Sequence, residues 1–138
     1  MAIAAELVRL YSEEEYLERE EKALEKSEFY RGRIYAMAGT SHDHSLIASN
    51  SIYEIRTRLK GRPCEVHGSD MRIKVSPTGL YTYADASIAG GEIKFEDEHE
   101  DVLLNPTVIF EVLSKSTDRK STRLNSSHLK LSRMPSSA

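Results

Sequence analysis

Two apolar stretches decide the fold of this chain: Tyr81-Thr82-Tyr83-Ala84-Asp85-Ala86-Ser87-Ile88-Ala89 and Thr107-Val108-Ile109-Phe110-Glu111-Val112-Leu113. Their aromatic and β-branched residues predict a strand in each, with one acid inside it. A carboxylate in a buried strand is costly unless it is paired or coordinated. Asp85 and Glu111 on neighbouring strands would also repel each other unless a cation lies between them. We therefore expect a divalent-metal site, and we treat the rest of the chain as its scaffold.

Magnesium, or manganese in its place, is the metal that this pair of acids fits. Because side chains alternate along a strand, Glu111 shares a face with Ile109 and Leu113. If the two strands are adjacent, Asp85 and Glu111 can converge on one Mg²⁺, and the main-chain carbonyl of Val112 is a third candidate ligand. Mg²⁺ prefers oxygen ligands and keeps several waters, so two carboxylates suffice. The spacing leaves a second interpretation open, in which each acid pairs with an arginine or lies at a strand end.

The composition indicates one globular domain. The chain has 138 residues, of which 39% are hydrophobic and 30% charged. Its apolar runs are too short to span a bilayer, so we expect no membrane association. Cys64 is the one cysteine, which excludes an internal disulfide and favours a reducing, cytoplasmic location.

Charge is distributed unevenly along the chain. Residues 1–118 hold 14 basic and 22 acidic residues, a net charge of −8, whereas residues 119–138 hold five basic residues and no acid. The acidic body removes the simplest evidence for nucleic-acid binding. The Ser-rich segment 119–138 is predicted to be a disordered, non-native tail. A genuine basic arm for nucleic acid is the alternative.

Local signals predict the remaining elements. Ser12 begins a helix over Glu13–Lys26 with a capping box, and Gly32 turns a hairpin over Glu28–Met37. A long helix over Ser41–Lys60 presents one apolar stripe. Further strands are expected at Cys64–His67 and Met71–Val75, and the acidic segment Glu92–Asp101 is expected to be a loop.

Segments in a characteristic order and spacing cover about residues 10–118. They are the hairpin Glu28–Gly39, the helix with His44 in its first turn, and the stretches Ser69–Ile73, Tyr83–Ser87 and Asn105–Ser114. In these segments the chain resembles the Uma family of proposed restriction endonucleases, a branch of the PD-(D/E)xK nuclease superfamily. The resemblance implies a restriction-endonuclease-like α/β (α+β) fold over residues 1–118, with an N-terminal helix and hairpin, a long helix and a mixed central sheet. It also implies Mg²⁺-dependent cleavage of DNA.

The resemblance assigns roles to particular residues. Asp85 and Glu111 match the two motif acids, which are catalytic metal ligands, and Glu28 matches a third catalytic acid that can reach the site. Leu113, however, stands where the simple motif places its lysine. In the Uma branch a helix after the Glu strand supplies that lysine instead, and the resemblance stops before it. We therefore expect this truncated chain to be a weak or inactive nuclease.

Several other residues are accessory candidates. Asp70 opens a strand near the expected cleft, and Lys115 is near the place where a catalytic lysine is missing. His44 suits a capping or supporting role. A zinc pair of His42 and His44 is disfavoured, because histidines two positions apart at a helix start point in different directions.

Three functions compete on these grounds. The first is an endonuclease with DNA as its partner, the second a non-catalytic module that binds nucleic acid or protein, and the third a metal-dependent hydrolase of another substrate. A homodimer is left open.

Overall fold

The structure of the protein is a computed structural model that describes residues 9–113. Within this range lie the helices α1 (Glu13–Lys22) and α2 (His42–Leu59). The strands are β1 (Ser27–Tyr30), β2 (Arg33–Ala36), β3 (Cys64–His67), β4 (Arg72–Val75), β5 (Leu80–Tyr83), β6 (Ala86–Gly90), β7 (Val102–Leu103) and β8 (Val108–Phe110). No helix in this part of the chain has the length and apolar character needed to cross a membrane.

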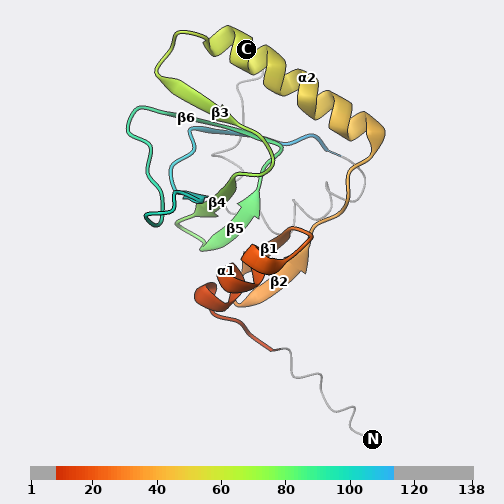
Figure 1. The fold of residues 1–138 in the computed structure, drawn as a ribbon, viewed down its shortest axis with the longest axis vertical. Helices are drawn as coiled ribbons and strands as arrows, with labels where there is room; N and C mark the ends of the chain where they lie inside the picture. The colour runs from red at the N-terminus through yellow and green to blue at the C-terminus, as the bar shows by residue number, and fades with distance from the viewer. Residues whose placement is uncertain (1–8, 114–138) are drawn as a thin grey trace, which may run out of the picture.

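The strands form two sheets. The larger sheet has five strands in the order β2-β1-β5-β4-β7, antiparallel except for the parallel pair β4 and β7. The smaller sheet is antiparallel, in the order β3-β6-β8. In Figure 1, α2 extends along β3 at one end of the described part, whereas α1 lies beside the β1–β2 hairpin at the other. This arrangement confirms the predicted α+β class and the order of helix, hairpin and long helix.

Local signals explain the first elements. Ser12 and Glu15 form the predicted capping box, because Ser12 Oγ accepts from the Glu15 amide at 3.1 Å and Glu15 Oε1 accepts from the Ser12 amide at 3.0 Å. The hairpin turns at Arg31 and Gly32, whose φ values of 49° and 82° are typical of a two-residue type I′ turn. Ser41 caps α2. Each of these features agrees with the sequence prediction.

Helix α1 ends at Lys22, earlier than the predicted Lys26. The carboxylate of Glu20 accepts hydrogen bonds from the Ser27 amide at 2.9 Å and from the Tyr83 hydroxyl at 2.7 Å. The chain therefore leaves the helix and turns back toward the larger sheet. These tertiary contacts outweigh the strong helical preference of the four residues that follow Lys22, Ala23–Lys26.

The apolar stretch Tyr81–Ala89, predicted as one strand, belongs to two. Strand β5 ends at Tyr83 in the larger sheet, and β6 begins at Ala86 in the smaller sheet. Asp85 lies at the bend where the chain passes between sheets, and Glu111 lies one residue past β8. The prediction that both acids sit inside strands is therefore wrong. The sequence did not indicate the break, because no glycine or proline interrupts the stretch Tyr81–Ala89.

Strand β7 is a second feature that the sequence did not predict. It follows the acidic segment and pairs in parallel with Arg72 and Ile73 of β4. Two residues, Val102 and Leu103, are too few to show a strand periodicity, so only the tertiary pairing defines this strand.

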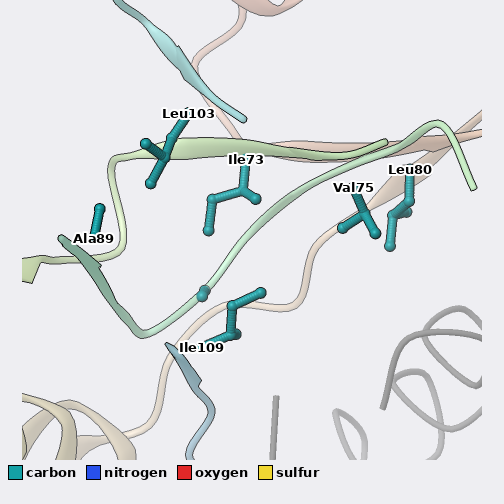
Figure 2. Packing of buried hydrophobic residues seen from close by; sticks show 7 residues of the cluster. Ile73, Val75, Leu80, Ala89, Leu103 and Ile109 are labelled. Atoms are coloured by element: carbon teal, nitrogen blue, oxygen red, sulfur yellow. The ribbon is translucent and has the colours of Figure 1, made fainter. Parts of the chain in front are cut away.

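The core joins the two sheets. Its main cluster combines side chains of β4, β5 and β7 with side chains of β6 and β8, and Figure 2 labels Ile73, Val75, Leu80, Ala89, Leu103 and Ile109. A second cluster attaches α1 to the larger sheet. There the ring of Tyr16 stacks on Phe29 with centroids 5.0 Å apart and lies 5.4 Å from the ring of Tyr81.

Helix α2 is held more loosely than its sequence suggested. The predicted apolar stripe, Ala48, Ile52, Ile55 and Leu59, is its most protected side, but none of its residues is fully buried. A cavity lies under the first half of this stripe. The helix therefore serves as one wall of that cavity.

Candidate active site

A cavity of about 760 Å³ lies between the N-terminal half of α2, the start of β1 and the bend after β5. Four acids line it, namely Glu25, Glu28, Asp85 and Glu111. Among the described lining residues, Lys26 is the one lysine or arginine. Because carboxylates collected in a concave site focus a negative potential, the cavity favours a cation.

Asp85 is fixed at the bend by contacts from two other segments. Its Oδ2 accepts a hydrogen bond from the Val112 amide at 2.7 Å. The Nε2 atom of His44 lies 3.3 Å from the same oxygen. The side chain of Asp85 is 21% exposed, so it is sheltered but reaches the cavity. The carboxylate is therefore oriented by the strand end after β8 and by the first turn of α2.

Strand pairing brings Glu111 to the same place. In the antiparallel pair of β6 and β8, Ala86 is opposite Phe110. Asp85 and Glu111 are the next residues outward on the two strands, and both line the cavity. The predicted adjacency of the two acids is thus present in the fold, although each acid lies just beyond its strand.

Glu28 is the most deeply buried acid of the cavity, with 5% of its surface exposed. The register of β1 and β5 pairs Phe29 with Tyr81, which brings the neighbouring Glu28 and Thr82 together. The hydroxyl of Thr82, itself 3% exposed, donates a hydrogen bond to Glu28 Oε2. A buried carboxylate is costly without such a donor. The third acid assigned by resemblance therefore lies in the cavity, and its catalytic role remains a prediction.

His44 connects Asp85 to the segment before α2. Its Nδ1 is hydrogen-bonded to Thr40 Oγ1 at 3.1 Å, while its Nε2 faces Asp85. Its main-chain amide also donates to the capping Ser41 at 3.2 Å. Both predicted roles of His44, capping and support of the site, are compatible with these contacts.

Of the other candidate residues in the described part of the chain, Val112 lies on the cavity wall and Asp70 does not. Asp70 is 95% exposed, forms an ion pair with Lys26 at 2.7 Å and is absent from the described lining of the cavity. Lys26 lowers the pKa of the Asp70 carboxyl through this contact. Val112 lines the cavity, but its amide is turned to Asp85, and a role for its carbonyl as a ligand stays a prediction. Lys115 lies outside the described residues.

Tyr83 contributes a hydroxyl that stays protonated. Burial, together with its hydrogen bond to the Glu20 carboxylate, raises the pKa of Tyr83 to about 12, although Arg72 opposes the shift. Tyr83 also lines the cavity. At neutral pH this tyrosine is therefore a hydrogen-bond donor and an aromatic wall, and it is not a general base.

The described residues provide few side-chain oxygen atoms that could coordinate a metal ion. Between residues 9 and 113, no three or more His, Cys, Asp or Glu side chains are grouped to hold a metal ion. His42 is 87% exposed and lies 3.3 Å from Asp43, whereas His44 faces Asp85, so the two histidines have different neighbours. Mg²⁺ is compatible with this donor set, since one or two carboxylates with waters are sufficient for it.

Thr40, Thr82 and Lys26 are site residues that sequence reasoning missed. Thr82 lies within a strand pattern and Lys26 at the predicted end of a helix, so neither position stood out. A signal for Thr82 did exist, because a polar residue between Tyr81 and Tyr83 in a buried strand needs a partner.

Two curated proteins of the cyanobacterium Synechocystis are similar to this chain. One, described as "Uncharacterized protein sll1609", is 39% identical over 102 residues, which are 74% of this chain and 58% of that protein. The other, "Uncharacterized protein slr1290", is 36% identical over 107 residues, or 78% of this chain and 55% of that protein. This chain thus spans a little over half the length of both relatives.

A solved structure supports the fold. It is described as a "putative nuclease belonging to DUF820" from Anabaena variabilis ATCC 29413, and it superimposes with a TM-score of 0.63 at 23% sequence identity. The likeness covers 86% of this chain and 65% of that one. The fold of this protein is therefore one that a nuclease-like protein also has.

A family model gives the clearest relationship. It carries the description "Putative restriction endonuclease" and matches residues 13–131, which extends past residue 118, the expected end of the domain. Since the match takes in most of the chain, this protein belongs to the Uma2 family of restriction-endonuclease-like proteins.

Proposed function

We propose that this protein is a Mg²⁺-dependent endonuclease that hydrolyses DNA phosphodiester bonds at the cavity containing Asp85 and Glu111. The observation that carries the proposal is that these acids, 26 positions apart in sequence, line one cavity together with the buried Glu28. The family description and the nuclease-like fold support the same reaction class.

Asp85 and Glu111 are the residues that would hold the cation through their carboxylate oxygens. Among the described residues, the Val112 amide and His44 both approach Oδ2 of Asp85, and we propose that Oδ1 is the oxygen that binds the metal. Mg²⁺ held by these carboxylates would supply Lewis acidity for a water and for the scissile phosphate. Glu28, which accepts a hydrogen bond from Thr82 and lines the cavity, is the residue that we propose to accept a proton or orient a water.

One observation favours a second candidate, a non-catalytic module that binds nucleic acid or protein. Leu113 stands at the position of the motif lysine and is 61% exposed. A cationic group that stabilises developing charge is often worth a few kcal/mol of the barrier, so a site without that group at position 113 should turn over slowly. Metal binding without any cleavage would identify this second function.

Titration calorimetry with Mn²⁺ tests the metal site. The full chain should bind one Mn²⁺, and Asp85→Asn combined with Glu111→Gln should abolish the binding heat. The matched control is Asp97→Asn with Glu98→Gln, which removes two exposed acids outside the cavity and should bind normally. Unchanged Mn²⁺ affinity in the Asp85/Glu111 double variant would refute the proposal.

A plasmid-nicking assay tests the reaction. Slow nicking that needs Mg²⁺ or Mn²⁺ and disappears in Asp85→Asn is the expected result. The Asp97/Glu98 control variant should nick at the wild-type rate. Nicking that persists in Asp85→Asn would show that a contaminating nuclease or another site is responsible.

A further inference from the structure

We propose that Lys26 is a substrate-binding residue that contacts a backbone phosphate of the nucleic acid entering the cavity. This inference rests on the proposed function. It assigns to Lys26 a positive charge at the cavity, whereas Leu113 occupies the position where the simple motif has its lysine. Sequence reasoning sought that cation after Glu111, whereas the fold brings a lysine to the cavity from before β1.

The cavity needs a positive group if a polyanion is to enter it. Four acids line it, and Lys26 is the lysine among the described residues of its wall. A divalent cation at Asp85 and Glu111 would offset only part of this negative charge. Phosphate contacts in nucleic-acid complexes come chiefly from lysine and arginine, so the Lys26 ammonium on this wall is suited to bind a backbone phosphate.

Lys26 is held in place along the same wall as Asp85. Its Nζ donates to the carbonyl oxygen of Ser69 at 2.8 Å and lies 5.4 Å from the centre of the Tyr83 ring. Tyr83 precedes Asp85 by two residues, and both line the cavity. The ammonium is thus pre-oriented near the bend that carries the candidate metal ligand, at a small cost in side-chain entropy on binding.

The third contact of Lys26 is one that a phosphate can replace. Its partner Asp70 is 95% exposed, and the Lys26 side chain is itself 39% exposed. Exposed ion pairs contribute about 0–1 kcal/mol, so exchanging the Asp70 carboxylate for a phosphate oxygen costs little. The main-chain carbonyl of Ser69 can keep its hydrogen bond during the exchange. Asp70 then acts as a competitor for the ammonium.

Fluorescence anisotropy with a short labelled DNA duplex tests the inference, using the full chain with Ca²⁺ in place of Mg²⁺. Lys26→Met should weaken binding about tenfold, as expected for loss of a charge-assisted hydrogen bond. The slope of log K against log salt concentration should fall in magnitude by about 1, the value for one phosphate contact. Lys26→Arg should keep both the affinity and the slope.

Two control variants distinguish a phosphate contact by Lys26 from an effect of net charge alone and from a purely structural role of this lysine. Lys22→Met removes an equal charge from the exposed end of α1, outside the described cavity wall, and should change the slope much less. Asp70→Asn breaks the same ion pair from the other side and should bind DNA at least as tightly as the wild type. Circular dichroism melts of all variants report whether the fold is intact.

The outcomes are distinct. If Lys26→Met behaves as Lys22→Met does, or if Asp70→Asn weakens binding as much as Lys26→Met, the lysine is structural and the inference is overturned. A wild-type chain without measurable DNA affinity would overturn it as well. The proposed metal-dependent function is judged separately by the Mn²⁺ titration of the Asp85 and Glu111 variants, which does not depend on Lys26.

Discussion

Replacing Lys74 by methionine should destabilise the fold by about 2 kcal/mol and leave the cavity unchanged. Lys74 Nζ lies 2.9 Å from Glu13 Oε2 and 2.9 Å from Glu96 Oε2. The hydroxyl of Tyr81 lies 2.8 Å from the same Glu13 oxygen and 2.7 Å from the same Glu96 oxygen. This network ties α1 and the segment before β7 to strands β4 and β5. None of its four residues is among the described residues of the cavity wall.

The exposure of each partner sets the magnitude. The Lys74 and Glu96 side chains are 22% and 24% exposed, so their contact approaches the value of a half-buried, charge-assisted hydrogen bond, about 1.5 kcal/mol. The Glu13 side chain is 45% exposed, and solvent screening reduces the contribution of its ion pair with Lys74 to about 0.5 kcal/mol. Removing Lys74 also leaves the carboxylates of Glu13 and Glu96 beside the Tyr81 hydroxyl without a cation. The repulsion between these two carboxylates adds to the destabilisation.

The effect should depend on pH. The hydrogen bond from Lys74 holds the pKa of Glu13 below its usual value of 4.5. That part of the stability is present above pH 4.5 and is lost as the pH falls through the lower pKa of the folded state. Burial opposes the charge of Lys74, but its bonds to Glu13 and Glu96 raise its pKa, so the lysine stays charged at neutral pH. The difference between wild type and Lys74→Met should therefore be largest near pH 7 and shrink below about pH 4.5.

Urea unfolding followed by far-ultraviolet circular dichroism measures the effect, because the sequence has no tryptophan to report it. The slope m should stay the same while the midpoint falls. Lys22→Met, on the exposed end of α1, is the control and should change stability by less than about 0.5 kcal/mol. Adding Glu96→Gln to Lys74→Met should restore part of the loss. If Lys74→Met lowers the free energy of unfolding at neutral pH no more than Lys22→Met does, the stabilising role of this network is refuted.

Three further changes test other contacts. Gly32→Ala should cost about 1–2 kcal/mol in urea unfolding, because φ is +82° there and the new Cβ would lie 3.2 Å from Leu10, and an unchanged midpoint would contradict the strain. Thr82→Val should cost about 1.5–3 kcal/mol, because the buried Glu28 carboxylate loses the hydrogen bond from this hydroxyl, whereas Thr82→Ser should retain most of the stability. His44→Ala should weaken Mn²⁺ binding about 10- to 100-fold by calorimetry, since it removes one of the two groups that orient the Asp85 carboxylate, and wild-type affinity in this variant would exclude that role.

Much of the local structure followed from short-range chemistry in the sequence. The capping box at Ser12, the turn at Gly32 and the cap at Ser41 depend on neighbouring residues, and each is present as predicted. The sequence also singled out Asp85 and Glu111, because an acid within an apolar stretch is conspicuous. Both acids line the cavity, although their role as metal ligands stays a prediction.

The tertiary structure alone decided how these pieces meet. No glycine or proline interrupts the stretch around Asp85, so the sequence did not indicate the change of sheet there. The pairing of β6 with β8 determines which residues lie beside Glu111. The presence of Lys26 on the cavity wall depends on contacts with Ser69 and Tyr83, residues 43 and 57 positions away in the sequence. Caps and turns are set by groups a few bonds apart, whereas the cavity is set by pairing between distant strands, and residue preferences carry no information about such pairing.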